Sequence, residues 1–519
     1  MEESGKKGFK DAIEPFLTRL PAVKRPEKHV HFRKKLAWTA GILVLYFILS
    51  NVAVFGLSKN SQDLFGAWRA IFAGASGSII LLGIGPIVTA SIILQLLVGA
   101  EILKLDVTET QDQAIFQGLQ KLLVFVMIVV ETLPQIFGGF VQTDTGIATS
   151  VNGFLNSLLP LNIQGTGLLT LIMFLQICAG GVIILYMDEI VSKWGIGSGV
   201  SLFIVAGIAQ ALVGGVINWL PPYDAPLSLG TATSSANLPI GILFKWNYMA
   251  ANPGLSYWLN PQNIFNFLYT GDVLALLATV VIFLMVVYVE STRIEIPLAH
   301  AAVRGARGKF PVKLIYASVL PMILVRAIQA NAQMIGLFLY RNYGITLLGT
   351  YDLSGNYPIS GIMYYINPIR GMQDWVPSLA SQQIQGISLL QIGLHVITDA
   401  FILIAGGIIF AIFWVETTGM GSSKVAKQIQ KSGMQIPGFR RNEQVIEKVV
   451  ARYIPKVTVI GGAFVGLLTL IASLFGVLGS VSGTGMLLCV SIIYQLYEKL
   501  ASEQLMEMHP LIRKFLGEE

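Results

Sequence analysis

Residues 79–99 read IILLGIGPIVTASIILQLLVG, an apolar run of the length that a helix needs to cross a bilayer. The hydrocarbon core requires ~20 apolar residues in helical form. Gly83, Gly85 and Pro86 interrupt the run close to its start, where they leave backbone groups that protein or water must satisfy. This stretch therefore predicts a membrane helix that is broken near one end.

Nine further apolar runs make the chain an all-α integral membrane protein. Its 519 residues are 54% hydrophobic and only 12% charged, with a mean hydropathy of +0.67. Soluble domains carry about 25% charged residues. The two cysteines lie inside apolar runs, so we expect neither a disulfide framework nor a thiolate metal site. The ten predicted spans lie at about 36–57, 79–99, 115–137, 167–187, 199–219, 270–290, 314–340, 387–415, 457–479 and 483–499.

Lysine and arginine residues are unevenly distributed among the predicted loops. Of the 35 in the chain, 29 fall on the side of the N-terminal arm (residues 1–35) and five on the opposite side. Basic loops remain in the cytoplasm, so both termini are predicted to be cytoplasmic, with residues 504–519 as a tail. The two long outer loops, about 220–269 and 341–386, carry few charges, and we expect them to pack on the outer face.

The sequence offers no convincing catalytic constellation. Its five histidines lack metal-ligand spacing to carboxylates or cysteines, and no phosphate-binding loop ending in Gly-Lys-Ser/Thr occurs. We therefore expect no enzymatic activity, no cofactor and no metal. Any energy for transport must come from a partner, an ion gradient or the substrate.

Ionisable and amide side chains inside the predicted spans are costly and mark functional candidates. They are Glu131 in the third span, Arg326 and Asn331 in the seventh, and Asp399 in the eighth. A guanidinium cannot discharge itself by losing a proton, so Arg326 must reach water or a carboxylate, and a water-filled lumen would satisfy it. Two interpretations stay open: hydrogen bonds that hold helices together, and the ion or proton relay of a secondary transporter.

Several motifs resemble those of the SecY family in its archaeal and eukaryotic branch. The motifs follow the family's order from the first span to the C-terminus, so the resemblance covers nearly the whole chain. Besides residues 82–99, they are 63–71 (DLFGAWRAI), 116–121 (FQGLQK), 197–204 (GSGVSLFI), 437–441 (PGFRR) and 483–488 (GTGMLL), with Tyr497 and Glu498 after the last.

The resemblance implies two pseudo-symmetric halves of five helices, residues 36–219 and 270–503, around an hourglass pore. Such a channel passes unfolded secretory polypeptides across the membrane and releases transmembrane segments laterally into lipid. The two halves would meet at a lateral gate between spans 2–3 and 7–8. Thr89, Glu131 and Asn331 match the polar cluster of that gate.

The resemblance also implies roles for three further sets of residues. The narrowest point of the pore would be a ring of aliphatic side chains: Ile84, Val88, Val200, Ile204, Ile323 and Leu488. A plug at about 61–77 would close the outer side, with Leu64, Phe65, Gly66, Ala67, Trp68, Arg69, Ala70, Ile71 and Phe72. A docking surface for the ribosome would contain Arg304, Arg307, Lys309, Arg440 and Arg441.

The implied partners are two small membrane subunits like SecE and Secβ, the ribosome, signal peptides and nascent chains. A cytosolic motor and a homodimer stay open, and the implied location is the plasma membrane. Arg326 departs from the family pattern, because it places a permanent charge one turn from the ring residue Ile323. If Arg326 lined the lumen, it would make the pore select against cations.

Overall fold

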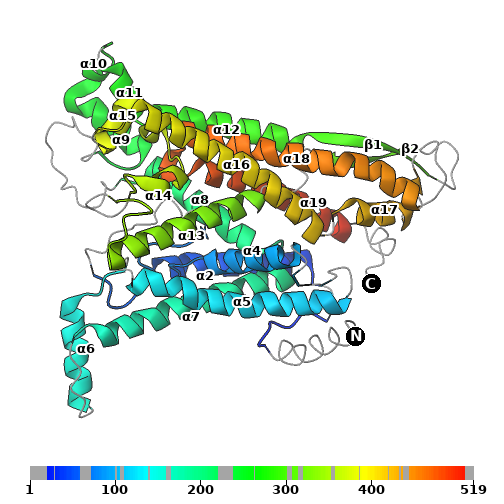
Figure 1. The fold of residues 1–519 in the computed structure, drawn as a ribbon, viewed down its shortest axis with the longest axis horizontal. Helices are drawn as coiled ribbons and strands as arrows, with labels where there is room; N and C mark the ends of the chain where they lie inside the picture. Colours follow the sequence, from blue (N-terminus) through cyan, green and yellow to red (C-terminus); the bar gives the residue numbers. More distant parts are fainter. Residues whose placement is uncertain are drawn as a thin grey trace.

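The chain is nearly all helical (Figure 1). Its computed structural model describes residues 20–27, 30–58, 72–99, 102–103, 105, 110–137, 141–158, 165–219, 238–261, 263–300, 307–313, 320–351, 357–384, 386–418, 420–431, 434–435 and 443–508. A helix lies at each of the ten predicted spans: α2 (Phe32–Asn51), α4 (Gly85–Gly99), α5 (Thr110–Phe137), α7 (Gly167–Trp194), α8 (Gly199–Ile217), α12 (Val273–Ser291), α13 (Leu320–Tyr343), α16 (Leu389–Thr417), α18 (Glu443–Phe475) and α19 (Gly483–Met508). Among the described residues, seven helices are long and apolar enough to cross a membrane, namely α5, α7, α8, α12, α13, α16 and α18.

Pro86, part of the interruption predicted in residues 79–99, and Pro321, inside the predicted span 314–340, both lie at helix starts. Pro86 is the second residue of α4, and Pro321 is the second residue of α13. A proline in the first turn lacks only an N–H that would have no partner inside the helix. The residues from 79 to 84 form turns, so α4 has 15 residues and is about 22 Å long at 1.5 Å per residue.

α18 begins at Glu443, well before the predicted start at residue 457. Its first turns pack against α17 (Ser422–Lys431) and the end of α16. A small separate core at this contact includes Val415, Ile429 and Ile446, all buried. This packing supports the amphipathic start of α18 beyond the apolar run from which the span was predicted.

A small sheet joins two of the basic loops and departs from the all-α expectation. β1 (Arg293–His300) pairs antiparallel with β2 (Arg307–Lys313). β3 (Met434–Gln435) pairs with the far end of β1, so the strand order is β2-β1-β3. The hairpin projects beyond α12 at the same end of the molecule as α17 and the C-terminal end of α19 (Figure 1).

The short helices of the outer loops lie at the end of the molecule opposite the hairpin (Figure 1). α6 runs across the direction of the long helices there, and the others gather above it. These elements are α6 (Thr145–Leu158), α9 (Ile242–Met249), the π-helix η2 (Ala250–Gly254), α10 (Leu255–Trp258), α11 (Ile264–Thr270), α14 (Gly361–Ile366), the 3-10 helix η3 (Met372–Asp374) and α15 (Pro377–Gln383).

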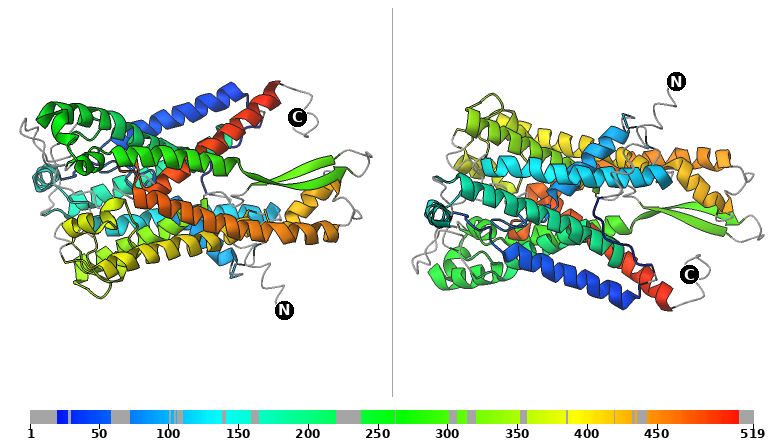
Figure 2. Two further views of the ribbon diagram at one scale, coloured as in Figure 1. Left: turned by 90° about the horizontal axis from the view of Figure 1, so that it is seen from above. Right: turned by 90° about the horizontal axis from the view of Figure 1, so that it is seen from below.

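One main core runs through both predicted halves. α4 packs on α5 within its own half, and on α13 and α16 across the chain's midpoint, while α8 packs on α19. In both views of Figure 2, the dark blue helix α2 of the first half and the red helix α19 of the second half lie on the same side of the molecule. The halves therefore contact each other through α4 and α8 of the first half and α13, α16 and α19 of the second.

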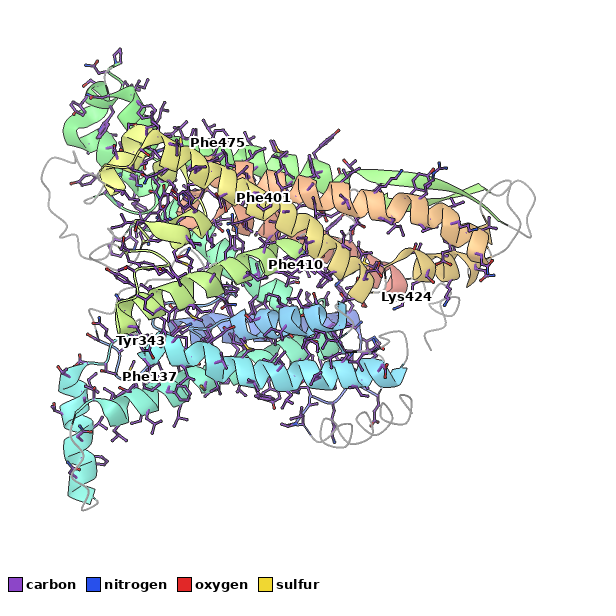
Figure 3. The ribbon with its side chains drawn as sticks, in the orientation of Figure 1. Phe137, Tyr343, Phe401, Phe410, Lys424 and Phe475 are labelled. Atoms are coloured by element: carbon purple, nitrogen blue, oxygen red, sulfur yellow. The ribbon has the colours of Figure 1, made fainter. Side chains whose placement is uncertain are left out.

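The outer surface of the bundle is apolar. The side chain of Phe401 projects from α16 and is 71% exposed (Figure 3). α12 exposes Leu277, Val280 and Leu284 along one face. An apolar surface of this extent is unstable in water and is suited to lipid, which agrees with a multi-pass membrane protein.

Candidate functional site

Five of the six aliphatic residues predicted to form a ring lie on the four helices α4, α8, α13 and α19, and Ile84 lies in the turn directly before α4. Five of them are buried in the main core: Ile84, Val88, Ile204, Ile323 and Leu488, with exposed fractions from 0% to 6%. Val200 is partly buried and packs against the same core. These side chains therefore belong to the main core that runs through both halves.

Ile84 occupies a tight turn directly before α4. Gly83 has φ +56°, and a Cβ atom there would lie 2.0 Å from the carbonyl oxygen of Phe72. The N–H of Ile84 donates to the same oxygen at 2.7 Å. Only glycine fits at position 83, because any other residue would have an unfavourable φ and its Cβ atom would clash with the backbone at Phe72.

A second hydrogen bond holds Ala73, the residue after Phe72. Tyr46 of α2 is buried and donates its hydroxyl to the carbonyl oxygen of Ala73 at 2.9 Å. Phe72 is the last of the plug residues that the resemblance names, and the others, 64–71, lie outside the described part of the chain. Two residues within the predicted plug, Phe72 and Ala73, are therefore held by hydrogen bonds to the turn before α4 and to α2.

Asp188 of α7 holds the start of α8, where Val200 and Ile204 lie. Its Oδ1 accepts a hydrogen bond from the N–H of Val200 at 2.8 Å, while Ser198, at the N-cap position, makes no side-chain cap. A Cβ atom on Gly199 would lie 2.5 Å from the Asp188 Cα, so α8 begins in close contact with α7. The sequence predictions missed Asp188, although a carboxylate at the end of an apolar run is a visible signal.

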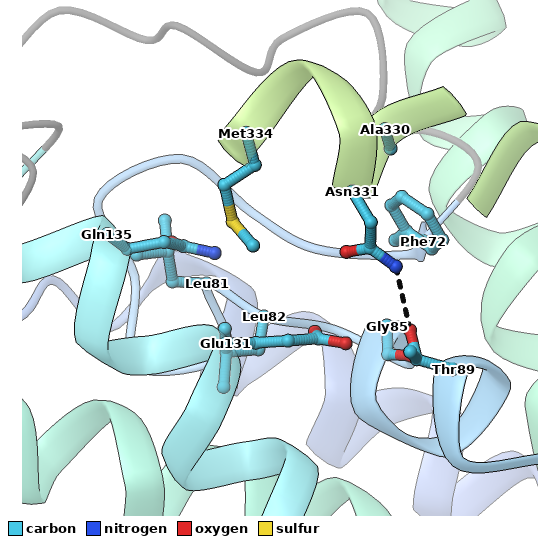
Figure 4. Close-up of a pocket in the computed structure, with 10 residues that line it drawn as sticks. All are labelled: Phe72, Leu81, Leu82, Gly85, Thr89, Glu131, Gln135, Ala330, Asn331 and Met334. Atoms are coloured by element: carbon cyan, nitrogen blue, oxygen red, sulfur yellow. Dashed lines mark hydrogen bonds between the residues drawn. The ribbon is translucent and has the colours of Figure 1, made fainter. Parts of the chain in front are cut away.

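Thr89, Glu131 and Asn331 lie together around a cavity of about 60 Å³ between α4, α5 and α13. Asn331 Nδ2 donates to Thr89 Oγ1 at 3.3 Å across the two halves (Figure 4). Glu131 points toward Gly85 and Thr89, and its Oε1 has no hydrogen-bond partner among the described residues. The cavity is lined by Phe72, Leu81, Leu82, Gly85, Thr89, Glu131, Gln135, Ala330, Asn331 and Met334.

The polar contact at this cavity is a weak link between the halves. Thr89 already donates its hydroxyl proton to the carbonyl oxygen of Gly85 at 3.0 Å, so it meets Asn331 as an acceptor. Such hydrogen bonds between membrane helices contribute about 0.6 to 2 kcal/mol. A contact of this strength can open without disrupting the packing of either half.

Two of the five predicted docking residues belong to the small sheet. Arg307 and Lys309 belong to β2, opposite Ala299 and Pro297 of β1. Arg304, Arg440 and Arg441 lie outside the described residues. Because β3 pairs with β1, the loops that carry both groups of basic residues meet at one end of the molecule.

The base of the hairpin is attached to α19 by Glu498. Its two carboxylate oxygens accept hydrogen bonds from Arg293 Nη2 at 2.8 Å and from Lys313 Nζ at 2.5 Å. Lys313 also lies over the ring of Tyr494, with its Nζ 5.4 Å from the ring centre. The helix that carries Leu488 is thus connected to the hairpin at Glu498, near its middle.

Arg326 reaches a carboxylate and not a water-filled lumen. Its Nη1 lies 3.2 Å from Asp399 Oδ1, and the two side chains are 1% and 0% exposed. Of the two environments that the sequence allowed for Arg326, water and a carboxylate, the structure supplies the carboxylate, and the buried pair carries no net charge. Glu131 lies at the separate cavity of Figure 4, so these three residues do not form one relay.

The part of the chain that the structure describes holds no group of three or more His, Cys, Asp or Glu side chains that could bind a metal ion. Both cysteines are free thiols within it.

Comparison with known proteins places these features in one family. The SecY family model matches residues 78–497, and the model for the plug domain of Sec61p matches residues 44–77. The protein translocase subunit SecY of Archaeoglobus fulgidus is 54% identical, covering 98% of this chain and 99% of that protein. The SecY subunit of Haloferax volcanii is also 54% identical, with 99% and 100% covered.

Two solved structures resemble the fold along nearly its whole length. A structure of a protein conducting channel has a TM-score of 0.76 and 39% identity, covering 96% of this chain and 99% of that one. Sec61 in the canine ribosome-channel complex from the endoplasmic reticulum has a TM-score of 0.73 and 38% identity, with the same coverage.

Proposed function

Because the chain belongs to the SecY family of protein translocation channel subunits, we propose that α4, α8, α13 and α19 enclose a pore that is closed at its waist by Ile84, Val88, Val200, Ile204, Ile323 and Leu488. As a channel subunit with a plug, the chain passes unfolded secretory polypeptides across the membrane and releases transmembrane segments into lipid. The observation that supports the pore assignment is that these side chains lie in the core shared by the two halves, on or directly before helices that pack across the chain's midpoint.

The aliphatic waist suits a channel that must pass any sequence. An apolar constriction excludes ions because water leaves it readily. Isoleucine, valine and leucine side chains have no charge or hydrogen-bond preference, so they adapt to whichever polypeptide segment passes. The waist is closed at rest and widens when the halves move apart.

The plug closes the outer side of the waist and is connected to it. The hydrogen bond from Ile84 N–H to the Phe72 carbonyl joins a residue of the predicted plug to the first waist residue along the chain. Displacement of residues 61–71 pulls on this bond and on the turn at Gly83. The plug and the waist therefore open together.

The lateral gate lies between α4 and α5 on one side and α13 and α16 on the other. The Asn331–Thr89 hydrogen bond supports this assignment, because it is the polar contact across the boundary. An apolar signal segment that binds between these helices favours the separated state over the closed one, which shifts the equilibrium toward opening.

The proposed topology has ten membrane spans in two pseudo-symmetric halves, residues 36–219 and 270–503. The matching starts of α4 and α13, each with proline as second residue, support the repeat. The charge distribution supports cytoplasmic termini, and the archaeal relatives support the plasma membrane as location.

The proposed partners are the ribosome, signal peptides, nascent chains, and two small membrane subunits like SecE and Secβ. The resemblance to Sec61 in a ribosome-channel complex supports ribosome docking on the sheet that carries Arg307 and Lys309. Arginine and lysine bind the phosphate groups of RNA. The chain itself is proposed to catalyse no reaction, so the force on the substrate comes from such a partner.

Deletion of the plug tests the pore directly. A chain lacking residues 61–71, assembled with its small subunits in planar bilayers, should conduct ions, whereas the parent channel should be tight. A chain lacking residues 225–235 of the outer loop has lost the same number of residues and should also be tight. Absence of conductance after plug deletion contradicts the proposed pore.

A further inference from the structure

Arg326 is bonded to three other helices of the second half. Its guanidinium is 1% exposed and donates from Nη1 to Asp399 of α16 at 3.2 Å, and from Nη1 to Gln329 at 2.8 Å. Its Nε donates to Thr484 of α19 at 2.8 Å, and its Nη2 to Ser473 of α18 at 3.3 Å. One side chain of α13 thus holds α16, α18 and α19.

The network is buried, and its geometry is constrained. Asp399 and Thr484 are 0% exposed, and Ser473 is 1% exposed. The second oxygen of Asp399, Oδ2, has no hydrogen-bond partner among the described residues, so the carboxylate depends on Arg326 and Gln329. A planar guanidinium with five N–H groups fixes the directions of its partners, which an aliphatic contact does not.

The position of the network along α13 and α19 relates it to the waist. Arg326 follows Ile323 by one turn, and Thr484 precedes Leu488 by one turn. Residues three or four apart lie on the same side of a helix. The Arg326–Thr484 hydrogen bond therefore joins the two helices one turn from the side chains that the second half contributes to the waist.

We propose that Arg326 is a positioning residue, which fixes the spacing and rotation of α13 against α19 so that Ile323 and Leu488 meet in the closed waist. This inference rests on the proposed pore. It gives the buried pair a role in gating that differs from general cohesion of the helices. It also predicts that the second half moves as one body when the channel opens.

Thr484 and Ser473 each accept a hydrogen bond from the Arg326 guanidinium. Variants of these two residues distinguish a positioning role from general cohesion of the helices. Thr484 links Arg326 to α19, which carries Leu488, whereas Ser473 links it to α18, which carries no waist residue. Thr484→Val and Ser473→Ala each remove one buried hydrogen bond and leave the Arg326–Asp399 pair intact. Both should lower the melting temperature to a similar extent.

The measurement is the frequency of ion-conducting openings of the full-length channel, with its small subunits, in planar bilayers. Thr484→Val should raise this frequency about tenfold, as expected for one hydrogen bond to a charged group. Ser473→Ala should leave the opening frequency unchanged. Thr484→Ser, which keeps the hydroxyl, should have the same opening frequency as the parent channel. If Thr484→Val does not accumulate, Thr484→Cys, whose sulfur is a weak acceptor, replaces it with the same expectation.

Equal opening frequencies for Thr484→Val and Ser473→Ala overturn the inference. Leu488→Ser serves as the control for the pore itself, because it places a hydroxyl in the proposed waist. If Leu488→Ser conducts and Thr484→Val does not, the positioning role fails while the pore stands. If Leu488→Ser stays tight, the waist assignment fails and the inference fails with it.

Discussion

Gly83→Ala adds one carbon atom at the contact between the plug and the waist. The new Cβ would lie 2.0 Å from the carbonyl oxygen of Phe72 and 2.6 Å from the backbone nitrogen of Gly74. Backbone at these distances cannot be accommodated by a side-chain rotation, so residues 72–74 must move. Their movement away from the turn relieves the clash and weakens the closed state relative to the open one.

The expected magnitude follows from two terms. An alanine held at φ +56° costs roughly 1–2 kcal/mol relative to glycine. Loss of the 2.7 Å hydrogen bond from Ile84 N–H to Phe72 removes about 0.5–1.5 kcal/mol. Together they shift the closed–open equilibrium by about 1.5–3.5 kcal/mol, or roughly 10- to 300-fold at 1.4 kcal/mol per factor of ten.

Single-channel recording of the reconstituted variant measures this shift as the fraction of time spent conducting. Gly214→Ala in α8 is the matched control, because a Cβ atom there meets no atom within 4 Å. That variant should stay as tight as the parent. The reasoning is refuted if Gly83→Ala conducts no more than Gly214→Ala while both are assembled in equal amounts.

Three further changes test other parts of the account. Thr89→Val removes the hydrogen bond to Asn331 and should let marginally apolar segments enter lipid roughly 3- to 30-fold more often in a membrane-insertion assay; unchanged insertion contradicts the gate. Arg326→Met leaves a buried unpaired carboxylate and should lower unfolding free energy by about 3–5 kcal/mol, while adding Asp399→Leu should recover most of it in chemical denaturation; an equally unstable double variant contradicts the pairing. Glu498→Gln breaks two half-exposed pairs of about 0.2–1 kcal/mol each, so stability should barely change while protease cleavage of the hairpin rises; unaltered cleavage contradicts the attachment.

Much of the helical framework is predictable from hydropathy, because a membrane span is a property of a local run of residues. The helix starts at Gly85 and Leu320 are harder to predict. A proline inside an apolar run is read as a break, and only the fold shows that the preceding residues form turns. α18 extends beyond its apolar run because α17 covers its amphipathic start, which is a tertiary contact.

The polar residues show a similar division. Arg326, Asp399, Glu131 and Asn331 are visible in the sequence because charge and amide groups stand out in apolar runs. Which of them pair is not visible, since Arg326 and Asp399 are far apart in the chain and meet through the packing of α13 on α16. The sequence therefore left open whether Arg326 meets water or a carboxylate, and the structure shows the carboxylate of Asp399.

The β-hairpin was not predicted, because its strands lie in loops whose sequences were used only to count lysine and arginine residues. Antiparallel pairing of β1 and β2, and the addition of β3 from a distant loop, give no apolar pattern of membrane length. Gly83 and Asp188 likewise depend on close approach of separate segments, which the sequence does not reveal.

Crosslinking of a stalled secretory chain to the waist tests the central claim most directly. Single cysteines at Ile84 and Ile323 are introduced into a chain whose Cys178 and Cys489 are replaced by alanine, with Phe401→Cys on the apolar outer surface as control. A soluble secretory chain halted in transit should crosslink to the cysteines at 84 and 323 and not to the one at 401. Crosslinks to the outer position, with none to the two inner ones, would contradict a pore between the halves.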